Sequence, residues 1–133
     1  MNAARVKKIY DSTKTIAIVG LSDKPERPSH QVASYLQSRG FKIIPVNPNI
    51  LQVLGEKSYT SLLDISEEVD VVDIFRRREY VPEIVDQAIK IGAKTIWMQE
   101  GIIDEQSAEK AREKGIEVIQ NMCMMKTHQK LKL

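Results

Sequence analysis

Short apolar runs alternate with longer amphipathic segments along the whole chain. The apolar runs cover residues 15–19, 42–46, 69–75, 94–98 and 116–119. Segments with helical spacing of apolar residues lie between them, at residues 30–39, 81–91 and 104–114, and a short helix is expected at residues 1–11. No tight hairpin turn joins the first two runs, so the helix between them is expected to make them parallel. This alternation of apolar runs and amphipathic segments predicts an α/β fold with a parallel sheet of about five strands.

Two short segments cannot be assigned clearly to a strand or to a helix. Residues 53–59 are consistent with either a short edge strand or a turn, and residues 61–65 with a single helical turn. The other segments have clear ends: Gly40, Gly92 and Gly115 follow the three long helical patterns, as glycines that end helices do.

Length and composition narrow the class of protein. The 133 residues fit one domain spanning residues 1–133, and no apolar run approaches the roughly 20 residues of a membrane span. With no signal-peptide pattern at residues 1–10, we expect a cytoplasmic protein that binds no membrane. The net charge of +2, with basic residues dispersed among acidic ones, argues against nucleic acid as a partner. Cys123 is the only cysteine, which excludes an internal disulfide and a cysteine-rich metal site.

The loop after the first strand has the features of a phosphate site. Gly20 allows a sharp turn, Ser22 follows it, and Arg27-Pro28-Ser29 precede the next helix. We expect Ser29 to cap a helix that starts near His30, whose free N–H groups favour an anion, while Arg27 supplies a guanidinium. A solvated arginine with an ordinary N-cap is the alternative. The loop differs from a dinucleotide-binding loop, because Ser22 and Pro25 stand where its second and third glycines would be.

Residues after the other strands extend this candidate site. Ligands of open parallel sheets bind at the carboxyl ends of the strands. An NAD-binding domain usually has an acid after the second strand, but this chain has Asn47-Pro48 there, which disfavours NAD and leaves either a nucleoside contact or a strand stop. The other candidates are the phosphate clamp Phe75-Arg76-Arg77-Arg78, which could instead be an exposed basic turn, and Gln99 with Gly101, which could be a simple turn.

Catalytic groupings are absent from the sequence. It contains no recognisable nucleophile motif, no metal-ligand spacing around His30 or His128 and no P-loop, so we expect no catalytic residue and no metal. Trp97 is expected in the core. Asp73, inside a strand, is expected to pair with an arginine or a backbone group. Cys123 is either a packed apolar residue or a thiol facing the ligand.

The motifs together resemble the small stand-alone CoA-binding proteins, and they are similar to the CoA domain of succinyl-CoA synthetase alpha subunits. They are Ile18-Val19-Gly20-Leu21-Ser22, Arg27-Pro28-Ser29-His30, Ile44-Pro45-Val46-Asn47-Pro48, Leu54-Gly55-Glu56-Lys57, Val71-Val72-Asp73-Ile74-Phe75-Arg76-Arg77, Trp97-Met98-Gln99-Glu100-Gly101 and Asn121-Met122-Cys123. The resemblance implies a Rossmann-like fold of three α/β/α layers, with coenzyme A lying across the strand ends.

The resemblance also implies a place for each candidate residue. Near the phosphates it puts Gly20, Ser22, Arg27, Pro28 and Ser29, with Val32 beneath them. Asn47 and Pro48 are expected beside the adenosine half, Phe75 and Arg76 over it, and Gln99 and Gly101 towards the pantetheine end.

Three functions fit these observations. We favour a non-catalytic CoA-binding or acyl-CoA-binding protein that acts as a carrier, sensor or regulator. The alternatives are an oxidoreductase or other nucleotide-dependent enzyme using NAD(P) in the same cleft, and an interaction protein whose basic tail at residues 126–132 binds an acidic partner. A narrower hypothesis is that Cys123 forms a mixed disulfide with the CoA thiol.

Overall fold

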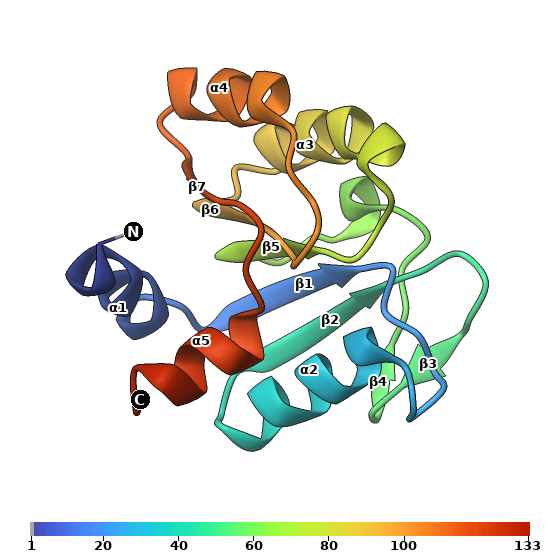
Figure 1. Cartoon of the computed structure of the whole chain (residues 1–133). Coiled ribbons are helices and arrows are strands. Elements are labelled where there is room, and N and C mark those ends of the chain that lie inside the picture. The colour runs from blue at the N-terminus through green and yellow to red at the C-terminus, as the bar shows by residue number, and fades with distance from the viewer. Residues whose placement is uncertain (1) are drawn as a thin grey trace.

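Five parallel strands form the central sheet of the computed structural model, which describes residues 2–133 (Figure 1). Their order across the sheet is β2-β1-β5-β6-β7, and every neighbouring pair is parallel. The strands are β1 (Thr15–Val19), β2 (Lys42–Val46), β5 (Val71–Ile74), β6 (Thr95–Met98) and β7 (Glu117–Ile119). The expected α/β, Rossmann-like sheet of about five strands is therefore confirmed.

Helices cover both faces of this sheet (Figure 1). One face carries α1 (Ala3–Asp11), α2 (Pro28–Ser38) and α5 (Met124–Lys130), and the other carries α3 (Val81–Lys90) and α4 (Glu105–Glu113). The strands alternate between the two faces: Ile16 and Ile18 of β1 pack towards α1 and α2, whereas Ala17 and Val19 pack towards α3. Because both faces are covered, most residues of the strands are apolar, and Asp73 of β5 is a buried exception.

The direction of the chain across the sheet reverses between β1 and β5. From β1 the chain passes through α2 to β2 at one edge, and it then returns to β5 on the opposite side of β1. Such a reversal leaves the carboxyl ends of the two strands open to a ligand, because their following loops run in opposite directions. Gly20 follows β1 and Phe75 follows β5, so these two residues mark the opening.

The segment at residues 53–59 is a small hairpin outside the main sheet. Strands β3 (Gln52–Val53) and β4 (Glu56–Lys57) pair antiparallel, joined by Leu54 and Gly55, which both have positive φ. Two consecutive residues with positive φ are typical of a type I′ turn, whose twist matches that of the two strands in a hairpin. Tyr59 then forms a parallel bridge with Val46 of β2, and residues 62–64 form the expected single turn, a 3₁₀ helix.

One helix was not expected from the sequence. The basic tail at residues 126–132 largely belongs to α5, which buries Met124, Thr127 and His128 against the sheet. Among residues 2–133, no helix has the length and apolar character needed to cross a membrane.

Candidate functional site

A cavity of about 520 Å³ opens at the carboxyl end of β1. The loops after β1, β2 and β5 and the start of α2 form its wall. The lining residues predicted from the sequence are Gly20, Ser22, Arg27, Pro28, Ser29, Asn47 and Phe75, and those not predicted are Asp23, Lys24, Asn49 and Ile50. The structure therefore gathers half of the candidate residues around one cavity.

Gly20 is required where the loops after β1 and β5 meet. Its φ is +88°, a conformation that residues with a side chain rarely adopt. A Cβ atom there would also collide with the carbonyl oxygen of Phe75 and lie 3.0 Å from Cδ of Arg76. Glycine thus lets the two loops approach each other at the opening of the sheet.

The start of α2 differs from the expectation. The helix begins at Pro28 with Arg27 as its N-cap, so the prediction that Ser29 caps a helix near His30 is wrong. The fixed φ of proline suits the first helical position, which moves the helix start two residues earlier. Ser29 is buried, and its hydroxyl instead accepts a hydrogen bond from the Ser22 N–H at 3.0 Å. In the described chain no side chain caps this end of α2. Pro28 has no N–H, and the N–H groups of His30 and Gln31 both donate to the Arg27 carbonyl oxygen at 3.1 Å, so among the first helical residues only the N–H of Ser29, which lines the cavity, is left for an anion.

His30 holds the same loop in place. Its Nδ1 lies 3.0 Å from the carbonyl oxygen of Ser22, which can only accept, so Nδ1 carries the proton. The Ser22 hydroxyl in turn accepts a hydrogen bond from the Lys24 N–H at 3.1 Å. The side chains of Ser22, Ser29 and His30 therefore fix the backbone around the cavity.

The arginines of the candidate clamp are not equivalent. Arg76 is half-buried, and its Cζ lies 4.2 Å from the centre of the Tyr80 ring. Arg77 is 85% exposed and lies 3.8 Å from a Glu79 carboxylate oxygen. Among the described residues, neither Arg27 nor Arg76 forms an ion pair within 4.0 Å. Carboxylates line the same cavities, namely those of Asp23, Glu83 and Glu100, but none of them occupies the N–H donors of these two arginines.

A second cavity, of about 430 Å³, adjoins the first through Pro28 and Phe75, which line both. Its remaining lining residues are Arg76, Arg77, Gln99, Glu100 and Ile102. Gln99 is buried, and its side-chain oxygen accepts a hydrogen bond from the Met124 N–H at 3.2 Å, which ties the end of β6 to α5. The cleft therefore continues from β1 past β5 to β6.

A third, smaller cavity of about 140 Å³ lies on the α3 side of the strand ends. It is walled by apolar groups and by several hydrogen-bonding side chains. The lining residues are Val19, Val46, Pro48, Thr60, Ser61, Arg76, Tyr80, Glu83, Ile84 and Gln87. Since Arg76 lines the second and the third cavity, all three meet around Phe75 and Arg76.

Asn47 has a structural task as well as a place in the cleft. Its side-chain NH₂ donates to the Leu21 carbonyl oxygen at 2.9 Å, and its Oδ1 accepts from the Asn49 N–H at 2.9 Å. The side chain thereby joins the loops after β1 and β2. Each atom makes one of these bonds and keeps one further donor or acceptor position, because the NH₂ group has two N–H donors and Oδ1 has two lone pairs.

Three candidate residues line none of these three cavities. Val32 lies on the buried face of α2, in the core, and Gly101 donates its N–H to Oδ1 of Asn121 at 2.7 Å. Cys123 is 5% exposed, and its sulfur accepts a hydrogen bond from the Lys126 N–H at 3.5 Å. A mixed disulfide with CoA would therefore require the first turn of α5 to move, and it stays a prediction.

Asp73 contradicts its expected pairing. It is fully buried on β5, and neither carboxylate oxygen has a hydrogen-bond partner among residues 2–133. Its neighbours in the sheet are Ile18 and Trp97, which offer no charge. Burial raises the pKa of Asp73 well above its usual value, because the carboxylate has no partner in the described chain that would stabilise its charge. Trp97 itself is fully buried, as expected, with its N–H donating to the Met122 carbonyl oxygen at 2.9 Å.

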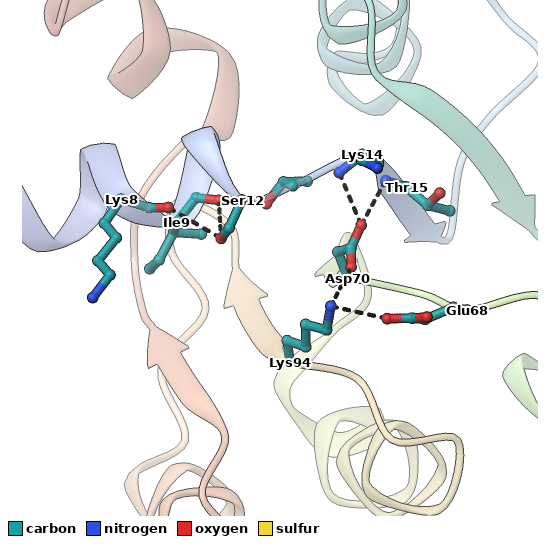
Figure 2. Close-up of polar contacts among 9 residues, drawn as sticks. Lys8, Ile9, Ser12, Lys14, Thr15, Glu68, Asp70 and Lys94 are labelled. Carbon is teal, nitrogen blue, oxygen red and sulfur yellow. Dashed lines mark hydrogen bonds and ion pairs between the residues drawn. The ribbon is translucent and has the colours of Figure 1, made fainter.

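Asp70 shows the opposite behaviour at the amino-terminal edge of the sheet (Figure 2). Its carboxylate accepts the backbone N–H groups of Lys14 and Thr15 at 2.8 and 3.0 Å and lies 3.2 Å from Lys94 Nζ. Burial raises its pKa, but these hydrogen bonds and the Lys94 charge together outweigh burial and lower it. This cluster joins the starts of β1, β5 and β6, at the opposite end of the strands from the cleft. Within the described chain, no three His, Cys, Asp or Glu side chains are grouped to hold a metal ion.

Comparisons with known proteins cover nearly the whole chain. A family model described as "CoA binding domain" matches residues 14–129. The uncharacterized protein YneT of Bacillus subtilis (strain 168) is 40% identical over 125 residues, which are 94% of this chain and 93% of that protein. A solved structure of a hypothetical protein from Pyrococcus horikoshii OT3 superposes with a TM-score of 0.96 at 40% identity and covers 100% of this chain and 94% of that one.

Larger proteins share part of the sequence. The ADP-forming acetate-CoA ligase II of Archaeoglobus fulgidus is 37% identical over 83 residues, which are 61% of this chain but 12% of that protein. The similarity thus covers a small portion of the ligase, and the ligase activity is that of the whole protein.

Proposed function

Because the chain belongs to the CoA-binding domain family, we propose that it binds coenzyme A or an acyl-CoA across the ends of β1, β5 and β6 and catalyses no reaction. One observation carries this proposal. At the opening between β1 and β5, Arg27 and Arg76 line the cleft around Gly20, and neither forms an ion pair with a carboxylate of the described chain. A ligand with several phosphates suits such a site, because a guanidinium can donate two parallel hydrogen bonds to a phosphate.

The three cavities correspond to the three parts of CoA. The diphosphate would lie in the first cavity, between Arg27 and the uncapped start of α2. The adenosine would lie in the third cavity beside Pro48, where Glu83 and Gln87 offer hydrogen bonds to its polar edges. The pantetheine arm would follow the second cavity past Phe75 to Gln99 and Ile102.

A role without catalysis is supported by the sequence, which contains no recognisable nucleophile motif, P-loop or metal-ligand spacing. We therefore propose that this chain acts as a carrier, sensor or regulator of CoA or acyl-CoA. An NAD(P)-dependent role is less favoured, because Asn47 follows β2, where an NAD-binding domain usually has an acid.

Mass spectrometry of ligands retained by the gently purified protein tests the proposal. The expected result is CoA or an acyl-CoA, whose acyl group would also be identified. Retention of NAD(P) with no CoA species would favour the oxidoreductase instead. Incubation of the loaded protein, followed by detection of an unchanged thioester, tests the absence of catalysis, and thioester breakdown faster than in buffer would contradict it.

A further inference from the structure

Arg76 stands between two cavities, and its guanidinium rests on an aromatic ring. Its Cζ lies 4.2 Å from the centre of the Tyr80 ring, well within the range at which the ring face attracts a cation. Arg76 lines the second and third cavities, and Tyr80 lines the third. The ring is therefore both a wall of the cleft and a support for the arginine.

The opposite side of the Arg76 side chain is also confined. Its Cδ atom is so close to Gly20 that a Cβ atom on Gly20 would lie only 3.0 Å away. The aliphatic stem thus passes over the Gly20 backbone before the guanidinium reaches the Tyr80 ring. These two contacts, on consecutive parts of one side chain, restrict the directions in which the guanidinium can point.

An uncharged aromatic ring and a carboxylate can each hold a guanidinium in place, but they do so in different ways. A carboxylate would occupy N–H donors at the edge of the guanidinium and cancel its charge. Stacking uses only the flat face of the group, so its N–H donors and its charge remain available to another anion. The neighbouring Arg77 shows the contrast, because it lies 3.8 Å from the Glu79 carboxylate and is 85% exposed.

We propose that Tyr80 is a positioning residue, which holds the Arg76 guanidinium with its charge uncancelled and its N–H edge open to a phosphate of the bound nucleotide. The inference rests on the proposed function, because the phosphate is the one that CoA carries on its adenosine ribose, next to the third cavity, which Arg76 lines. It names the ligand class that this part of the cleft selects, a phosphorylated nucleotide, and it gives Tyr80 a role that requires no contact with the ligand.

A double-mutant cycle tests the proposal by isothermal titration of CoA. The proteins compared are the unsubstituted chain, Tyr80→Phe, Tyr80→Leu, Arg76→Ala and the Tyr80→Leu, Arg76→Ala double variant. Tyr80→Phe keeps the ring and is expected to bind within about twofold. Tyr80→Leu keeps apolar bulk but loses the stacking face, and its affinity is expected to fall about threefold to thirtyfold. In the Arg76→Ala background the same leucine substitution should cost nothing further.

A second variant tests the role of the uncancelled charge. Tyr80→Glu places a carboxylate where the ring was, and it is expected to weaken CoA binding more than Tyr80→Leu does, because the new carboxylate pairs with Arg76. Since Tyr80 is 41% exposed, the thermal unfolding temperatures of these variants should stay close to that of the unsubstituted chain.

The outcomes separate this inference from the proposed function. If the unsubstituted protein binds CoA but Tyr80→Leu binds equally well, or if the Tyr80→Leu and Arg76→Ala losses simply add, Tyr80 does not act through Arg76 and the inference is overturned while the proposed function stands. If the unsubstituted protein does not bind CoA, both are overturned.

Discussion

The backbone of Gly20 lies against the carbonyl group of Phe75, so closely that no side chain fits between them. These are the first residues after β1 and β5, the two strands between which the sheet reverses direction. Their contact brings Arg27 and Arg76 to the two sides of one opening. The proposed ligand site therefore depends on Gly20, although this residue has no side chain that could contact a ligand.

Replacement of Gly20 by alanine should destabilise the fold and weaken CoA binding. The positive φ alone costs about 1–2 kcal/mol for a residue with a Cβ, and the collision with Phe75 adds to it. Gly40→Ala is the matched control, because its φ is +95° but no atom lies within 4 Å of the added Cβ. Urea unfolding of both variants measures the difference. If both variants lose the same free energy of unfolding, the close approach of Gly20 to Phe75 does not contribute to the effect.

The buried acid Asp73 should make the protein less stable as pH rises. Burial raises its pKa above that of the unfolded chain, so between the two values the unfolded state has lost a proton that the folded state keeps. The stabilisation is complete below the unfolded pKa near 4 and is lost as pH rises towards the folded pKa, by about 1.4 kcal/mol per pH unit for one proton. Asp73→Asn, which cannot ionise, should remove this slope.

The free energy of unfolding, measured from pH 4 to pH 8 for both proteins, tests this prediction. Burial lowers the pKa of His128, so His128 makes stability fall as pH falls below its unfolded pKa and opposes Asp73 there. The difference between the unsubstituted chain and Asp73→Asn at each pH cancels the His128 contribution. A difference that does not change with pH would show that Asp73 ionises as readily in the folded state as in the unfolded chain.

Much of the fold was predictable because apolar runs bounded by glycine and proline define buried strands. Residues 15–19 and 42–46 form β1 and β2 with the predicted bounds. The basic helix α5 was missed, because its buried face consists of Met124, Thr127 and His128, which only the surrounding sheet makes into a packing surface. The isolation of Asp73 depends on neighbours from other strands, which no local pattern contains.

The candidate site was predictable to a similar extent. The rule that ligands lie at the strand ends selected loops that line the three cavities, and these cavities contain most of the chosen residues. The sequence could not distinguish residues that face the cleft from those that hold the loops. Ser29 and Asn47 bond to the loop after β1, and the support of Arg76 by Tyr80 appears only in three dimensions.

Asn47→Asp should weaken the protein without creating an NAD site. The aspartate lacks the NH₂ group that donates to the Leu21 carbonyl, and two oxygens would face each other across this contact. The expected loss of unfolding free energy is about 1–3 kcal/mol. Urea unfolding measures this loss, and titration with NAD⁺ should show no gain in binding. Submillimolar NAD⁺ affinity in the variant would show that only the missing acid excludes that cofactor.

The most direct test of CoA binding is isothermal titration of CoA into the unsubstituted protein, Arg27→Ala, Arg76→Ala and their double variant. Arg78→Ala serves as the control, because Arg78 is exposed and lines none of the three cavities. The account predicts that CoA binds, that each loss of a cleft guanidinium weakens binding about tenfold to hundredfold, and that Arg78→Ala binds within about twofold. Equal CoA affinity for the double variant and the unsubstituted protein would contradict it.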